Sequence, residues 1–296
     1  MTRNYQQRHA AGVRSYLFAP GNHPRRVQKV FQSGADAIIL DLEDAVAVSE
    51  KIATRSAVVA ALAPPRACLG YIRVNSFDTQ WCYGDLLAAV GARTDGIVLP
   101  KAETADQLRT LDWLITQLER ERGLPQGGID LMPIVETGKG IMALEALCTA
   151  TSRVRRVVFG GGDYTLDLDL QWTEQERELA FARGRLVHCS RAAEIEAPID
   201  TVLLQIRDHE RFRCTAQLAR QMGFQGKLCI HPDQVPIANQ VFAPSPAEVE
   251  HAHKVIAAFE RAEAQGLASI QLDGYFIDYP IVYKARRVAA LAARIL

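Results

Sequence analysis

The stretches LMPIVE (Leu131–Glu136) and VVFGGGD (Val157–Asp163) each begin with apolar residues and end in a carboxylate. Short apolar runs of this kind predict buried strands of a parallel sheet. If the two strands are neighbours, Glu136 and Asp163 face one pocket from adjacent strand ends. Two carboxylate ligands that leave several positions open are typical of a Mg²⁺ site. The two stretches therefore predict both a parallel sheet and a metal site.

The alternation of strand and helix extends in both directions from these stretches. Further strands are expected at residues 13–18, 36–41, 69–75, 96–100, 197–202 and 227–231. Helical spacing occurs at residues 24–32, 49–62 (with Ser49 as N-cap), 85–90, 105–121, 173–193 and 210–222. Eight strand–helix units predict a (β/α)₈ TIM barrel, here over residues 13–235. A doubly wound open sheet is the alternative, but the first strand has no GxGxxG motif after it.

Residues 236–296 exceed what a barrel requires. They contain an expected helix at 246–265, the segment 270–278 and a terminal helix that ends at Leu296. We expect this part to complete the same catalytic unit as a helical lid, or to reach into a neighbouring subunit.

The composition excludes several classes of protein. Of the 296 residues, 48% are hydrophobic, and Lys+Arg and Asp+Glu balance at 34 each, so no net charge favours nucleic acid or an anionic membrane. No apolar run approaches the ~18 residues of a spanning helix, and the polar N-terminus has no secretory signal. The six cysteines form no CxxC pair, which indicates free thiols rather than a disulfide or zinc site. We therefore expect a cytoplasmic protein without a nucleic-acid or membrane partner.

Active sites of barrels lie at the carboxyl ends of the strands. The polar residues expected there are Asp41, Glu43, Asp44, Arg73, Asn75, Lys101, Glu136, Asp163 and His231. So many carboxylates in a small area would repel one another unless a cation shared the site. The planar guanidinium of Arg73 suits bidentate binding of a substrate carboxylate.

Simpler explanations exist for some of these residues. Asp41 could cap a helix, and the glycines at 160–162 could cradle a phosphate, although we favour close approach of the backbone to the metal site. Lys101 could form a Schiff base with a ketone. A lysine among carboxylates keeps its proton, however, so an ammonium that contacts ligand or solvent is the favoured interpretation.

Seven motifs occur in order along the chain: RSYLFAPGN (14–22), GADAIILDLEDAV (34–46), IRVN (72–75), VLPK (98–101), PIVET (133–137), FGGGD (159–163) and CIHP (229–232). Together they resemble the citrate lyase β-subunit-like branch of the HpcH/HpaI aldolase family, which includes citryl-, malyl- and citramalyl-CoA lyases. The resemblance spans residues 13–294 and is more specific for the family than for the substrate. One departure is the sequence GGDYT at 161–165, where many relatives carry a plainer Asp-Leu.

The resemblance implies a Mg²⁺-dependent carbon–carbon lyase, with Mn²⁺ as a substitute, that cleaves a 3-hydroxyacyl-CoA by retro-Claisen chemistry. It places the metal on Glu136 and Asp163 and the 2-oxo acid carboxylate on Arg73. It puts Asp41 and Glu43 in supporting positions around the metal. Contacts with the CoA part of the substrate are implied for Phe18, Arg25, Lys29, Ile230 and His231.

The resemblance also implies a proton donor, Asp278, in the segment IDYP (277–280) of the C-terminal lid. The preferred reaction is cleavage of citramalyl-CoA to acetyl-CoA and pyruvate. The alternatives are a malyl-CoA lyase, or the β subunit of a citrate lyase complex that acts on citryl-CoA or on citryl acyl carrier protein. A homotrimer, or a multiple of it, is the implied assembly.

Overall fold

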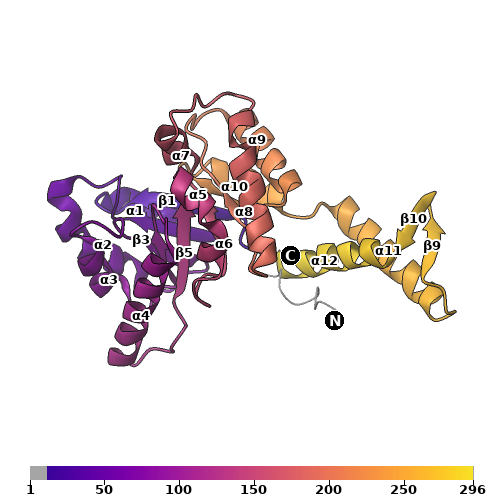
Figure 1. Cartoon of the computed structure of the whole chain (residues 1–296), viewed down its shortest axis with the longest axis horizontal. Helices are drawn as coiled ribbons and strands as arrows, with labels where there is room; N and C mark the ends of the chain where they lie inside the picture. Colours follow the sequence, from indigo (N-terminus) through magenta and orange to yellow (C-terminus); the bar gives the residue numbers. More distant parts are fainter. Residues whose placement is uncertain (1–11, 296) are drawn as a thin grey trace. The chain divides into compact units, whose positions relative to one another are not determined.

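The computed structural model describes residues 12–295. The chain forms two compact units, Val13–Gln240 and a C-terminal unit that begins at Val241. Eight parallel strands form a closed barrel in the first unit (Figure 1). They are β1 (Ser15–Pro20), β2 (Ala37–Asp41), β3 (Leu69–Arg73), β4 (Gly96–Leu99), β5 (Asp130–Val135), β6 (Val158–Phe159), β7 (Ile199–Asp200) and β8 (Gly226–Cys229). Each strand pairs with the next, and β8 closes the barrel by pairing with β1.

Helices follow the strands and cover the outside of the barrel, as in a (β/α)₈ fold (Figure 1). They are α1 (Pro24–Val30), α2 (Lys51–Leu62), α3 (Cys82–Ala89), α4 (Ala105–Glu121), α5 (Gly138–Met142), α6 (Leu144–Cys148), α7 (Gly161–Asp167), α8 (Ala180–Ala192), α9 (His209–Met222) and α10 (Gln234–Phe242), with 3₁₀ turns η1 (Val48–Glu50) and η2 (Arg177–Leu179). The TIM barrel expected from the sequence is therefore confirmed. Within residues 12–295, no helix combines the length and apolarity needed to cross a bilayer.

Burial on both faces explains why the strands are so apolar. β2 reads AIILD and is buried at all its positions. Side chains such as Ile39, Val98 and Met132 meet in the centre of the barrel, so its interior is a packed core. The strand register also places polar groups at the carboxyl edge, where Asp41 of β2 pairs with Arg73 of β3.

Three local predictions were wrong. The helix expected at 173–193 begins only at η2, because Glu176 has a left-handed backbone (φ 50°) and its buried carboxylate accepts from Arg183 at 2.7 Å. Ser49 does not cap a helix and lies inside η1. The sixth strand ends at Phe159, so Asp163 lies in the first turn of α7 and not at a strand end.

The C-terminal unit has a small core of its own. Helix α11 (Pro246–Glu263) packs against α12 (Tyr279–Ile295), and β9 (Ser269–Leu272) pairs antiparallel with β10 (Tyr275–Asp278) between them in the chain (Figure 1). Ser245 begins α11 with a capping box that includes Glu248. Buried side chains from the helices and the hairpin form one cluster: Ala252, Val255, Phe259, Ile277, Val282 and Ala285.

Candidate active site

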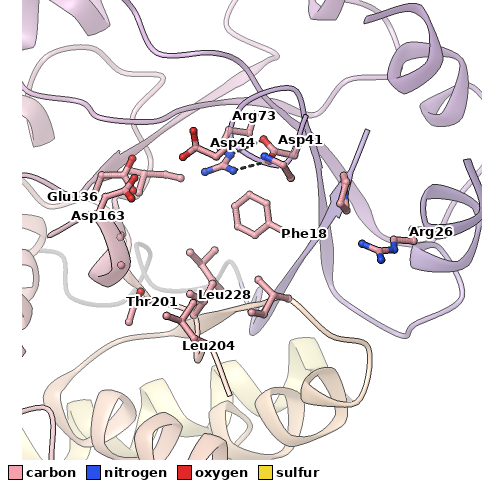
Figure 2. Close-up of a pocket in the computed structure, with 17 residues that line it drawn as sticks. Phe18, Arg26, Asp41, Asp44, Arg73, Glu136, Asp163, Thr201, Leu204 and Leu228 are labelled. Atoms are coloured by element: carbon pink, nitrogen blue, oxygen red, sulfur yellow. Dashed lines mark hydrogen bonds and ion pairs between the residues drawn. The ribbon is translucent and has the colours of Figure 1, made fainter. Parts of the chain in front are cut away.

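A pocket of about 330 Å³ opens at the carboxyl ends of the barrel strands. Its polar lining includes Asp41, Asp44, Arg73, Glu136, Asp163 and Thr201, and its apolar lining includes Phe18, Ile134, Val202, Leu204, Leu228 and Ile230. Figure 2 shows the acidic groups and Arg73 on one side of the pocket, Leu204 and Leu228 on the other, and the Phe18 ring between them. The pocket therefore combines a charged side with an apolar one.

Glu136 and Asp163 lie side by side in this pocket (Figure 2). Glu136 directly follows β5 and is only 4% exposed, whereas Asp163 is about one-third exposed on α7. The backbone at Gly160 passes so close to Glu136 that any Cβ there would collide with its carboxylate. Burial, followed by the negative charge of Asp163, raises the pKa of Glu136 to about 8.

This donor set fits a divalent cation. Two adjacent carboxylates, one of them desolvated, repel each other until a positive charge lies between them. Within residues 12–295, no cluster of three or more Asp, Glu, His or Cys side chains has metal-site geometry. Glu136 and Asp163 could hold such an ion while its remaining positions stay open to water or substrate, as Mg²⁺ prefers.

Arg73 is held in place by two carboxylates. Its Nε and Nη2 atoms donate to Asp41 at 2.7 and 2.6 Å, and its Nη1 lies 2.9 Å from a Glu43 oxygen. The guanidinium also lies over the ring of Phe18, 4.9 Å from the ring centroid. Burial alone would raise the pKa of Asp41, but the charge of Arg73 holds it below its usual range. One N–H on each of Nη1 and Nη2 remains for a substrate carboxylate.

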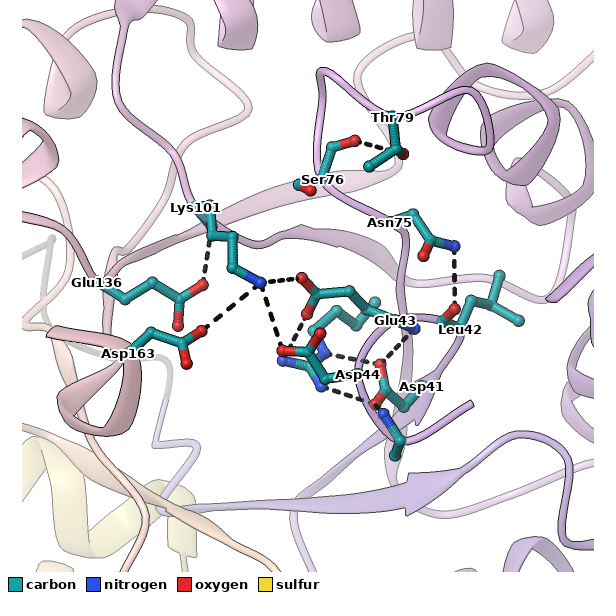
Figure 3. Close-up of polar contacts among 12 residues, drawn as sticks. Asp41, Leu42, Glu43, Asp44, Asn75, Ser76, Thr79, Lys101, Glu136 and Asp163 are labelled. Atoms are coloured by element: carbon teal, nitrogen blue, oxygen red, sulfur yellow. Dashed lines mark hydrogen bonds and ion pairs between the residues drawn. The ribbon is translucent and has the colours of Figure 1, made fainter. Parts of the chain in front are cut away.

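Lys101, two residues after the end of β4, points into the acidic group (Figure 3). Its ammonium donates to Glu43 at 2.5 Å and lies 3.3 Å from Asp44 and 3.6 Å from Asp163. Partial burial would lower the pKa of this lysine, but the hydrogen bond to Glu43 and the surrounding carboxylates raise it above its usual value. Since Schiff-base formation needs the neutral amine, the geometry disfavours that role.

Two residues expected at the site, Asn75 and His231, do not line the pocket. Asn75 is buried, accepts from the ammonium of Lys51 at 2.6 Å and donates to Asp85 at 2.7 Å, so it joins the start of α2 to α3. His231 is not among the pocket-lining residues, and its ring lies 3.4 Å from Asp233. The predicted contact of His231 with substrate stays a prediction.

The residues proposed for CoA binding divide into two groups. Phe18 and Ile230 line the pocket, whereas Arg25 and Lys29 are exposed on α1 and do not. The α1 residue that lines the pocket is Arg26, which the sequence did not single out. Helical spacing shows that these basic residues are exposed, but it does not show which of them faces the barrel opening.

Thr201 is another pocket residue that sequence reasoning missed. Its hydroxyl accepts from the backbone N–H of Gly161 at 2.7 Å and so holds the first turn of α7, which carries Asp163. Nothing in the local pattern around Thr201 indicates this contact, because it joins residues forty positions apart.

Asp278 belongs to the C-terminal unit, where it is the last residue of β10. Its carboxylate accepts from the backbone N–H of Ile281 at 3.4 Å, at the start of α12. This contact is that of a helix cap. Its role as a proton donor stays a prediction.

Known proteins match this chain over nearly its full length and over nearly the full length of their own chains. A family profile described as HpcH/HpaI aldolase/citrate lyase matches residues 14–232. The citrate lyase subunit beta of Leuconostoc mesenteroides subsp. cremoris is 38% identical over 285 residues, which cover 94% of this chain and 93% of that protein. The (3S)-malyl-CoA thioesterase of Cereibacter sphaeroides is 35% identical over 286 residues, 95% of each chain.

Solved structures agree with these relatives. Protein CitE from Mycobacterium tuberculosis, in complex with magnesium, acetoacetate and coenzyme A, superposes with a TM-score of 0.77 at 26% identity, over 96% of this chain and 99% of that one. A citrate lyase from Burkholderia xenovorans shares the fold with a TM-score of 0.84 at 20% identity, over 95% and 92% of the two chains. The chain belongs to the HpcH/HpaI aldolase/citrate lyase family, as its sequence motifs predict.

Proposed function

We propose that this chain is a Mg²⁺-dependent lyase that cleaves a 3-hydroxyacyl-CoA to acetyl-CoA and a 2-oxo acid. The observation that carries the proposal is the pair Glu136 and Asp163, side by side in a pocket that also contains Arg73. The comparisons support it, since relatives are named citrate lyase subunit beta and the Mycobacterium tuberculosis structure holds magnesium and coenzyme A.

The chain's own groups account for orientation and charge. Arg73 binds the carboxylate next to the scissile bond through its remaining N–H groups, and Asp41 and Glu43 keep the guanidinium from turning away. Glu136 and Asp163 would hold Mg²⁺, which would supply Lewis-acid stabilisation of the negative charge that develops during cleavage. The hydroxyl proton leaves to solvent, the electron pair of the broken bond passes to the thioester as an enolate, and a protonated Asp278 gives the α-carbon its proton.

The pocket lining favours a small apolar substituent on the substrate. Phe18, Ile134 and Leu228 contribute apolar surface to the pocket. In this proposal Arg73 already binds the substrate carboxylate next to the scissile bond and is not available for a second one. The other basic residue in the lining, Arg26, is drawn apart from the carboxylates (Figure 2). A methyl group therefore fits better than a carboxymethyl group, and we propose citramalyl-CoA, which yields pyruvate, as the preferred substrate.

The second candidate function is that of a citrate lyase β subunit acting on a citryl group carried by an acyl carrier protein. The 38% identity to the Leuconostoc protein over nearly the whole of both chains favours this alternative. It predicts that the isolated chain is slow with every free CoA thioester and that an added citryl acyl carrier protein restores turnover.

The test supplies citramalyl-, malyl- and citryl-CoA separately, with Mg²⁺, and follows pyruvate, glyoxylate and oxaloacetate. We expect pyruvate from citramalyl-CoA as the fastest reaction, loss of activity with EDTA, and recovery with Mg²⁺ or Mn²⁺. Free CoA should be measured too, because thiol release with no 2-oxo acid would indicate a thioesterase, the activity named for the Cereibacter relative. Absence of all products from all three thioesters and from the carrier-bound substrate would refute the lyase proposal.

A further inference from the structure

Lys101 contacts both proposed metal ligands through different parts of the residue (Figure 3). Its backbone N–H donates to Glu136 Oε1 at 2.8 Å, and its ammonium nitrogen lies 3.6 Å from Asp163 Oδ2. The same ammonium donates to Glu43 at 2.5 Å. The proposed reaction gives Lys101 no chemical step, so this placement needs another explanation.

The backbone of Lys101 has a left-handed conformation, with φ at 50°. Residues with a side chain adopt this region uncommonly, and single strained residues of this kind often lie at functional sites. In this conformation the amide points to Glu136 while the side chain extends to Glu43 and Asp163 (Figure 3). Glycine would satisfy the backbone without strain, but it would lack the ammonium.

We infer that Lys101 is the internal counter-cation of this carboxylate cluster, and that a divalent cation bound by Glu136 and Asp163 competes with its ammonium for Asp163. The inference rests on the proposed metal site. Without metal, the ammonium neutralises carboxylates that would otherwise repel one another. With metal bound, the same positive charge lies close to the ion and weakens its binding. Lys101 is thus a positioning residue that determines how tightly the site holds its metal.

The two contacts can be separated by mutation. Lys101→Met removes the charge but keeps the apolar stem and the amide that holds Glu136. Lys101→Gly also keeps the amide, and it relieves the left-handed backbone. The matched control is Lys139→Met, because Lys139 forms an ion pair of 2.9 Å with Glu103, which is not among the proposed ligands.

Mg²⁺ is titrated into each full-length variant by calorimetry without substrate, and Mn²⁺ is titrated in parallel with free ion detected by electron paramagnetic resonance. We expect both Lys101 variants to bind Mg²⁺ about tenfold more tightly than the wild type, which corresponds to about 1.4 kcal/mol. Their melting temperatures without metal should fall and should rise more on Mg²⁺ addition than that of the wild type. Lys139→Met should keep the wild-type dissociation constant within about twofold.

Each outcome decides the question. Unchanged or weaker Mg²⁺ binding in both Lys101 variants would overturn the inference while leaving the proposed function intact, provided the wild type binds Mg²⁺. A wild type that binds neither ion would refute the metal site and the proposed function together. Failure of both variants to fold in the presence of Mg²⁺ would also contradict the inference, because the added ion should replace the missing charge.

Discussion

At the scale of single residues, the guanidinium of Arg73 is fixed before any substrate binds. It forms a two-pronged contact with Asp41 and a third contact with Glu43, and it lies over the Phe18 ring. Lysine would keep the charge of Arg73 but not the planar fork. We expect Arg73→Lys to lower kcat/KM for the best thioester about a hundredfold, or about 2.7 kcal/mol, measured by 2-oxo acid release.

Arg14→Lys is the matched control, since Arg14 makes the same fork with Asp36, at 2.8 Å from both Nε and Nη2. Asp36 precedes β2, at the opposite end of the strand from Asp41, so kcat/KM should stay within about threefold. Wild-type kcat/KM in Arg73→Lys would show that the fork does not orient the substrate.

At the scale of elements, buried charges join β7 to β8 and to helix α8. Asp200 of β7 accepts from Arg183 at 2.8 Å and from Lys227 of β8 at 2.5 Å, and all three side chains have no exposed surface. Neutralising Asp200 leaves the buried ammonium of Lys227 without its counter-charge, whereas Arg183 keeps its ion pair with Glu176. We expect Asp200→Asn to lower the free energy of unfolding by about 3–5 kcal/mol in urea titrations at pH 7.

The same carboxylate predicts an acid dependence. Burial would raise the pKa of Asp200, but the charges of Lys227 and Arg183 hold it below its usual value of 3.8. A lowered folded-state pKa gives stability that is present above pH 3.8 and is lost as the pH falls through the folded pKa. Below pH 3.8, the free energy of unfolding of Asp200→Asn should fall less steeply with pH than that of the wild type. Asp106, which is exposed on α4, provides the control: Asp106→Asn should follow the wild-type dependence of stability on pH.

The elements also show what the sequence could predict. Strands such as β2 and β5 were predicted because burial on both faces leaves apolar runs, and the proposed ligand Glu136 was found because it directly follows β5. The helix predicted from residue 173 begins later because Glu176 contacts Arg183, and this contact forms only in the folded chain. Arg26 and Thr201 were missed for the same reason, since their relation to the pocket is tertiary.

At the scale of the whole molecule, the barrel unit contains the proposed metal ligands and Arg73, but the proposed proton donor Asp278 belongs to the C-terminal unit. Asp278→Asn should therefore separate binding from proton transfer. In D₂O with Mg²⁺ and pyruvate, wild type should exchange the methyl protons of acetyl-CoA, and the variant should exchange them at least a hundredfold more slowly. Its affinity for Mg²⁺, measured by calorimetry, should not change.

Asp273→Asn is the control on the same hairpin, because Asp273 pairs with Lys254 and is not assigned to the reaction. This variant should exchange the acetyl-CoA protons at the wild-type rate.

Mixing Asp278→Asn with Arg73→Lys then tests the proposed homo-oligomer. If Asp278 acts in a neighbouring subunit's site, hybrid assemblies contain some sites with both groups intact, and the mixture should exceed the summed activities of the two variants. If the activity of the mixed subunits equals the sum of the two variants' activities, Asp278 acts in its own chain's site. If Asp278→Asn alone exchanges the acetyl-CoA protons at the wild-type rate, Asp278 takes no part in the mechanism.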